Sequence, residues 1–186
     1  MPDIFIIAGC NGAGKTTAAY NLLPDVFKTV EFVNADEIAR GLSPFNPSGV
    51  AFQAGKIMLE RLAQLVDESH SFSFETTLSG LAYFGFIKKA KAKGYGITIF
   101  FVYLNSVNLA KERVAIRVSK GGHSIPKNVI ERRYYKGLNN FLRYANEADD
   151  WYLYDNSGSG YELVAKNAGG EEKIINFDVF KIVSGG

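Results

Sequence analysis

One short segment near the N-terminus constrains the fold more than any other part of the sequence. Residues 9–16 read Gly-Cys-Asn-Gly-Ala-Gly-Lys-Thr and satisfy the pattern G-x-x-x-x-G-K-[ST]. The apolar run before them, residues 4–8, is typical of a buried parallel strand, and residues 15–23 after them are expected to form a helix. A chance glycine-rich turn rarely has this context, so the sequence predicts a phosphate-binding P-loop.

The residue types in this loop suit the binding of a polyphosphate. Glycines let the backbone approach phosphate oxygens, and free N–H groups at the start of a helix favour negative charge. We expect Lys15 to reach the β- and γ-phosphates as a catalytic cation, and the Thr16 hydroxyl to ligate Mg²⁺. No Asn-Lys-x-Asp sequence, the guanine-reading motif of GTPases, occurs in the chain, so the predicted nucleotide is ATP. The predicted cofactors are therefore ATP and Mg²⁺. The predicted nucleotide-binding residues are Gly9, Asn11, Gly12, Ala13, Gly14, Lys15, Thr16 and Thr17.

Length and composition exclude several classes of protein. The 186 residues are 47% apolar and 22% charged, as in ordinary soluble domains, so a single domain over residues 1–186 is expected. The net charge of +2 is too small to favour a nucleic-acid or membrane partner. No apolar run approaches the roughly 20 residues that cross a bilayer, and the single cysteine, Cys10, cannot form an internal disulfide. We therefore expect a cytoplasmic protein.

Beyond the P-loop, predicted strands and helices alternate along the chain. This alternation indicates right-handed crossovers and a mostly parallel sheet with helices on both faces, the α/β fold of a P-loop NTPase. A turn-rich segment, residues 41–49, is expected to be a surface loop, and residues 151–165 a C-terminal β-hairpin that closes the sheet edge. Further strands are expected at residues 30–33, 72–75 and 97–104, and helices at residues 50–68, 81–93 and 127–146.

Two acidic residues, Asp36 and Glu75, follow predicted strands. The carboxyl ends of parallel strands lie at one edge of the sheet, so both carboxylates should face the P-loop across the ligand crevice. We expect Asp36 to accept the proton of an attacking hydroxyl, and Glu75 to orient the substrate or hold a metal-bound water. The alternative for either residue is that it merely caps the next helix.

A basic helix-loop-helix segment, at about residues 113–133, is predicted to form a lid. Arg113 and Arg117 are four residues apart and share one helix face, so they are expected to stabilise the charge of the transferring phosphoryl group. The alternative is a solvated basic face without a catalytic role. Arg132 and Arg133 are further candidates, and the sequence alone does not select among the four.

Together these motifs resemble the zeta-toxin family of P-loop kinases, in the branch often labelled as predicted ATPases. The resemblance covers nearly the whole chain. It rests on the P-loop with Thr17, Asn34-Ala35-Asp36 with Arg40, Ala54-Gly55-Lys56, Phe74-Glu75-Thr76-Thr77-Leu78-Ser79-Gly80, Arg113, Arg117, Gly121-Gly122-His123-Ser124-Ile125-Pro126, Arg132-Arg133 and Tyr154-Asp155-Asn156-Ser157.

The resemblance implies an ATP-dependent phosphotransferase that acts on a hydroxyl of a small molecule. In zeta toxins this molecule is UDP-N-acetylglucosamine, and by resemblance Asp36 is the base, while Glu75, Thr76 and Arg40 bind the acceptor. An antitoxin is a conceivable partner, although no segment of the chain indicates one. Two other functions stay open: a polynucleotide or nucleoside kinase, and a non-catalytic ATP-gated binding module. The module would need no base at Asp36.

Overall fold

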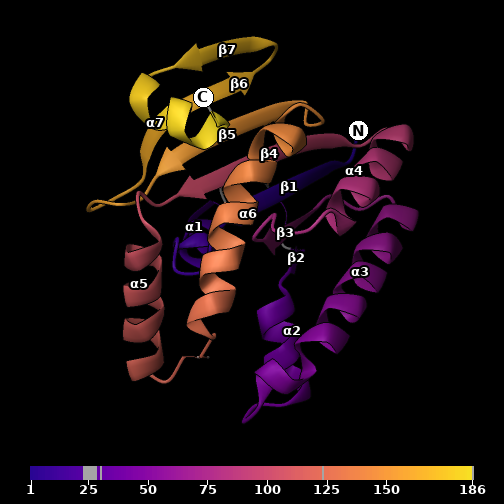
Figure 1. Cartoon of the computed structure of the whole chain (residues 1–186). Helices are drawn as coiled ribbons and strands as arrows, with labels where there is room; N and C mark the ends of the chain where they lie inside the picture. The colour runs from indigo at the N-terminus through magenta and orange to yellow at the C-terminus, as the bar shows by residue number, and fades with distance from the viewer. Residues whose placement is uncertain (23–28, 30, 123, 186) are drawn as a thin grey trace.

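The computed structural model describes residues 1–22, 29, 31–122 and 124–185. Within these residues, seven strands form one sheet with helices on both faces (Figure 1). In sheet order, the strands are β2 (Phe32–Val33), β3 (Phe72–Thr76), β1 (Asp3–Gly9), β4 (Gly96–Tyr103), β5 (Asp150–Asp155), β6 (Glu162–Ala168) and β7 (Glu171–Ile174). The first five pair in parallel, whereas β6 is antiparallel to both of its neighbours. The predicted fold class, a mostly parallel α/β sheet, is confirmed.

The helices connect the strands or follow the last of them. They are α1 (Lys15–Leu22), α2 (Ala35–Leu42), the 3₁₀ helix η1 (Pro47–Val50), α3 (Ala51–Asp67), α4 (Ala82–Ala92), α5 (Val107–Ser119), α6 (Lys127–Ala145) and α7 (Phe177–Ser184). The α2–α3 pair and the α5–α6 pair both extend from the sheet in the same direction (Figure 1).

The central strand β4 is buried on both faces, as its continuous apolar sequence predicts. On one face Ile99 belongs to the main core, which also contains Met58 of α3 and Phe141 of α6. On the other face Phe100 forms a smaller cluster with Ala19 of α1. Because β1 and β4 are adjacent in the sheet centre, the P-loop that follows β1 rests on the most buried part of the molecule.

The segment expected to be a surface loop, residues 41–49, does lie at the surface, but it is a loop only at residues 43–46, and both of its ends are helical. Helix α2 continues to Leu42, and η1 begins at Pro47 after a short connection. The side chain of Asn46 accepts a hydrogen bond from the Gly49 N–H at 3.2 Å and so caps η1. An asparagine cap followed by proline is a helix-start signal, which the density of turn-forming residues in this segment obscured.

The C-terminal hairpin is present in β5 and β6, but it does not close the sheet. A third antiparallel strand, β7, pairs with β6 through a turn at Gly169 and Gly170, and α7 follows, capped by Asn176. The prediction missed β7 because its residues are all exposed and mostly charged, so they read as a polar loop.

The other predicted elements match the structure closely. Ser106 caps α5 by accepting a hydrogen bond from the Leu109 N–H at 3.2 Å. Three predicted positions lie outside the described residues: Leu23 at the end of the first helix, Val30 at the start of the second strand, and His123 in the lid. None of the helices in the described ranges is long and apolar enough to cross a membrane.

Candidate active site

The P-loop joins β1 to α1, and its glycines are required by close contacts. Gly9 has a φ of +138°, and a side chain there would collide with the carbonyl oxygen of Val102 on β4. Gly14 has a φ of +92°, and a Cβ atom there would lie 2.7 Å from both Asn156 Nδ2 and the Tyr161 hydroxyl. Because α1 begins at Lys15, its free N–H groups face the interior of the loop.

Glu75 lies at the end of β3 and contacts the P-loop directly. Its Oε1 atom is 3.3 Å from Lys15 Nζ, and its Oε2 atom accepts a 2.6 Å hydrogen bond from the Thr16 hydroxyl. Asn34 Nδ2 donates to the same Oε2 atom at 3.1 Å, and Lys15 Nζ also donates to the Cys10 carbonyl. Both charged side chains of the ion pair are buried, so the pair is little screened by solvent.

The oxygens of Thr16 and Glu75 offer a suitable place for Mg²⁺. Magnesium prefers oxygen ligands and is usually held by one or two protein groups together with phosphates and waters. A hydroxyl and a carboxylate that lie 2.6 Å apart at the helix N-terminus fit this pattern. Of the two roles expected for Glu75, this position favours holding the metal or its bound water over binding the acceptor alone.

Asp36 borders two cavities of the site. The loop cavity, of about 180 Å³, is lined by the P-loop, Asp36, Glu75, Arg113 and Arg117. The α2–α3 cavity, of about 280 Å³, is also lined by Asp36. It is lined by Asn11, Lys15, Asn34, Ala35, Asp36, Ala51, Gly55, Glu75, Thr76, Thr77, Ser79, Gly80, Tyr83 and Arg133. Four residues, Asn11, Lys15, Asp36 and Glu75, therefore border both cavities.

Neither acidic residue is a helix cap, which was the alternative interpretation. The side chain of Asn34 caps α2 by accepting a 2.8 Å hydrogen bond from the Asp36 N–H. Helix α4, the next helix after Glu75, has no side-chain hydrogen bond at its cap residue, Leu81. The carboxylate of Asp36 instead projects from the first turn of α2 toward the two cavities.

Among the four candidate arginines, Arg133 is the one that borders the α2–α3 cavity with Asp36. Its Nη1 atom donates to Asn11 Oδ1 at 3.2 Å. Burial lowers the pKa of Arg133, and the negative charge of Asp36 partly offsets this effect. Arg113 and Arg117 border the loop cavity, and Arg132 is exposed on α6.

A third cavity, the lid cavity of about 560 Å³, lies between α2 and the lid. Its charged lining residues are Arg40, Arg113, Arg117 and Lys120. The side chain of Arg40 is 53% exposed and pairs with Glu37 at 3.2 Å. The structure thus separates Arg40 from Glu75 and Thr76, with which the sequence grouped it as an acceptor-binding residue.

Several site residues were not predicted from the sequence. Asn34 and Ser79 border the α2–α3 cavity, and so does Tyr83, whose ring centroid lies 5.2 Å from that of Phe74. The small polar residues that follow Glu75 were a signal for Ser79, whereas Asn34 directly follows β2 and precedes Asp36 by two residues. Tyr83 carried no comparable signal, since its spacing on α4 is that of a core residue.

Comparisons with known proteins agree with this geometry. The sequence profile of the zeta toxin family matches residues 1–161. A protein of Haemophilus influenzae, described only as uncharacterised, is 30% identical over 127 residues, which cover 68% of this chain and 88% of that protein.

Solved structures share the fold at low sequence identity. The AvrRxo1-ORF1:-ORF2 complex with ATP has a TM-score of 0.81 at 17% identity and covers 99% of this chain. This chain spans 64% of the length of that one. The PezAT toxin-antitoxin system of Streptococcus pneumoniae has a TM-score of 0.72 at 16% identity, covering 100% of this chain and 79% of that one. A gluconokinase of Sinorhizobium meliloti has a TM-score of 0.54 at 11% identity, covering 85% and 84%. With a family match that extends over most of its length, this chain belongs to the zeta toxin family.

Proposed function

We propose that this protein transfers the γ-phosphate of ATP to a hydroxyl of a small molecule bound in the α2–α3 cavity. The observation that carries the proposal is that Asp36 lines both this cavity and the loop cavity. A carboxylate at that position can accept the proton of a hydroxyl while the hydroxyl oxygen attacks phosphorus. The family match and the P-loop geometry support the same chemistry.

The residues around Asp36 have complementary roles in this reaction. The N–H groups of the P-loop and Lys15 hold the phosphates, and Thr16 with Glu75 would hold Mg²⁺. Bound Mg²⁺ supplies positive charge that offsets the negative charge on the phosphate oxygens during transfer. Arg113 and Arg117 border the loop cavity, where their charges would stabilise the transferring group once the lid closes.

The acceptor we propose is a sugar nucleotide of the UDP-N-acetylamino sugar class, as in the zeta toxins that the sequence resembles. The hydroxyl and carboxylate groups of Thr76, Thr77 and Glu75 suit the hydroxyls and amide of such a sugar. The lid cavity presents Arg40 and Lys120, which suit the diphosphate of a nucleotide. An antitoxin protein is a proposed partner, because PezAT is a toxin-antitoxin system.

The decisive experiment offers the protein several acceptors with Mg·ATP and detects the phosphorylated product by mass. We expect UDP-N-acetylamino sugars to be phosphorylated, and nucleosides and RNA or DNA ends to be ignored. Efficient labelling of 5′-hydroxyl ends alone would overturn this acceptor in favour of a polynucleotide kinase. Tight ATP binding without any product from a broad metabolite pool would instead favour the ATP-gated binding module.

A further inference from the structure

The outer segment, residues 155–161, runs from the last residue of β5 to the residue before β6. It contacts the carbonyl oxygens of the P-loop. Asn156 Nδ2 donates a 2.8 Å hydrogen bond to the carbonyl oxygen of Ala13. The Tyr161 hydroxyl donates a 2.7 Å hydrogen bond to the carbonyl oxygen of Gly14. These two carbonyls belong to the residues directly before Lys15, and nothing in the proposed reaction accounts for the contacts.

The two hydrogen bonds act on consecutive peptide groups. The Ala13 carbonyl accepts from Asn156, and the Gly14 carbonyl accepts from Tyr161 in addition to the Ala18 N–H of α1, which lies at 2.9 Å. In a trans peptide the C=O and the following N–H point in opposite directions. Holding the carbonyls of Ala13 and Gly14 against the outer segment therefore turns the N–H groups of Gly14 and Lys15 away from that segment, and both residues line the loop cavity. These N–H groups are among the donors that a P-loop offers to phosphate oxygens.

The outer segment is itself anchored firmly. The Asn156 N–H donates to the Tyr103 carbonyl at 3.0 Å, at the end of the central strand β4. The Ser157 hydroxyl accepts a 2.8 Å hydrogen bond from the Asn105 N–H, and the Ser157 N–H donates to Asp155 Oδ1 at 2.8 Å. A segment held in this way can impose its geometry on the loop that it touches.

The same segment also contacts the lid. Arg113 Nη2 donates to the Ser157 carbonyl at 3.4 Å, a long hydrogen bond between α5 and the outer segment. Burial is the main cause that raises the pKa of Tyr161, and the nearby charge of Arg113 partly offsets it. A phenol is already protonated at neutral pH at its ordinary pKa, so Tyr161 is a hydrogen-bond donor to Gly14.

We propose that Asn156 and Tyr161 are positioning residues that hold the P-loop in its phosphate-binding conformation. The ligand whose binding they affect is the polyphosphate moiety of the nucleotide. They act on it through the backbone of the P-loop and do not contact the phosphates themselves. This role rests on nucleotide binding at the P-loop, which is part of the proposed function, but it is independent of the acceptor. A different role, direct contact with the nucleotide base, makes a different experimental prediction.

The test compares ATP with inorganic tripolyphosphate, which has no base or ribose, by titration calorimetry with Mg²⁺. Tyr161→Phe removes one hydroxyl and keeps the ring, so we expect the Kd to rise about fivefold for both ligands, the effect of one net hydrogen bond. Asn156→Ala should act in the same direction. The matched control is Tyr135→Phe, because Tyr135 is 51% exposed on α6, and it should leave both Kd values unchanged.

Each outcome decides the matter. Weaker binding of ATP with unchanged binding of tripolyphosphate would show a base contact and overturn the proposal, and so would unchanged binding of both ligands by Tyr161→Phe. Each variant is titrated well below its unfolding temperature, so that a change in Kd does not reflect unfolding. If Asn156→Ala does not fold, Tyr161→Phe alone tests the proposal. Lys15→Ala separates the two proposals: if it still binds both ligands tightly, the P-loop assignment fails, irrespective of Tyr161.

Discussion

The two sides of the site differ in how firmly they are held. On the phosphate side, Lys15 is 5% exposed and lies against Glu75, and the carbonyls of Ala13 and Gly14 accept hydrogen bonds from a distant segment. On the lid side, Arg40 is 53% exposed and pairs with a neighbour on its own helix. The phosphate side is therefore preorganised, whereas in the proposed reaction the lid-side residues would become ordered only when the acceptor binds and the lid closes. Substitutions should accordingly have large effects on the first side and smaller ones on the second.

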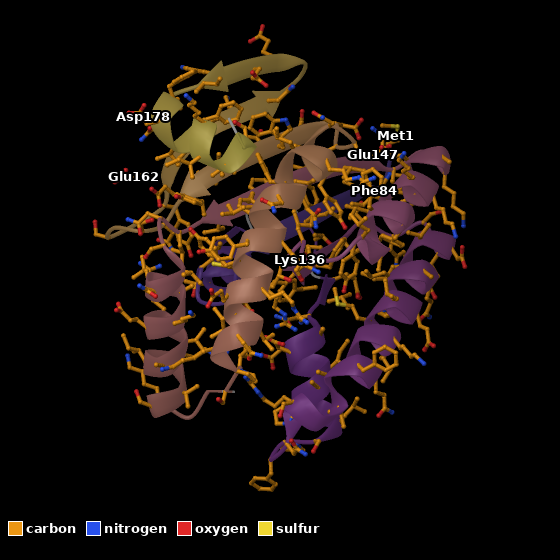
Figure 2. All side chains as sticks on the ribbon, viewed as in Figure 1. Met1, Phe84, Lys136, Glu147, Glu162 and Asp178 are labelled. Atoms are coloured by element: carbon orange, nitrogen blue, oxygen red, sulfur yellow. The ribbon has the colours of Figure 1, made fainter. Side chains whose placement is uncertain are left out.

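The largest effect is expected for Lys15→Ala, at the centre of the preorganised side. Removing this cation leaves the β- and γ-phosphate oxygens without their main side-chain charge, so kcat/KM should fall about 10³-fold or more. Steady-state kinetics measure the loss, and Lys136→Ala, on the exposed face of α6 (Figure 2), is the control that should retain activity. Unchanged turnover in Lys15→Ala would contradict the role of the P-loop.

The next effect is expected for Asp36→Asn, because Asp36 lines both the loop cavity and the α2–α3 cavity. An amide keeps the shape of the side chain but cannot accept the hydroxyl proton, so kcat should fall about 10²-fold while the Kd for ATP stays nearly constant. The matched control is Glu37→Gln, the adjacent carboxylate, whose side chain is 47% exposed in a surface pair with Arg40. Loss of ATP binding in Asp36→Asn would instead indicate a structural or metal-binding role.

Glu75→Gln tests the link between the phosphate side and the metal. The substitution removes the charge that pairs with Lys15 and weakens an oxygen positioned beside Thr16. We expect turnover to fall about 10-fold and the Mg²⁺ concentration for half-maximal rate to rise, because metal-bridged phosphate binding is a main catalytic contribution. A rise in the acceptor KM alone, with an unchanged Mg²⁺ dependence, would return Glu75 to a purely acceptor-binding role.

The same contrast explains what the sequence could predict. The P-loop and its flanking elements are specified by neighbouring residues, and strand-end position was enough to place Asp36 and Glu75 at one crevice. Arg133 and Asn156 reach the loop from segments 122 and 143 residues away, and no local pattern encodes such contacts. Adjacent arginines on α6 look equivalent in sequence, yet only the packing of the helix decides which one is turned toward Asp36.

Local sequence patterns did not predict two elements, the 3₁₀ helix η1 and the strand β7. The turn-forming residues between α2 and α3 suggested a loop, although Asn46 and Pro47 start η1. Strand β7 is stabilised by pairing with β6 while its side chains remain exposed, so it lacks the alternating pattern by which half-buried strands are recognised. In both places tertiary pairing or capping determined the structure more than the average character of the segment did.

The smallest effect is expected for Arg40→Ala, on the lid side. Surface ion pairs contribute about 1 kcal/mol or less, so losing the pair with Glu37 should hardly change the free energy of unfolding. If Arg40 binds an acceptor diphosphate from the lid cavity, the KM for a sugar nucleotide should rise about threefold to fivefold. The KM for a free sugar and the Kd for ATP should not change.

The control for Arg40→Ala is Arg61→Ala, because Arg61 on α3 forms a comparable surface pair with Glu31 at 3.0 Å. It should leave the KM of both kinds of acceptor unchanged. An equal rise in KM for the free sugar and the sugar nucleotide would assign Arg40 to the closing of the lid, since closure affects every acceptor. A rise in the Kd for ATP would show that Arg40, near the C-terminal end of α2, contributes to ATP binding. Arg40 would then belong to the phosphate side and not to the lid side.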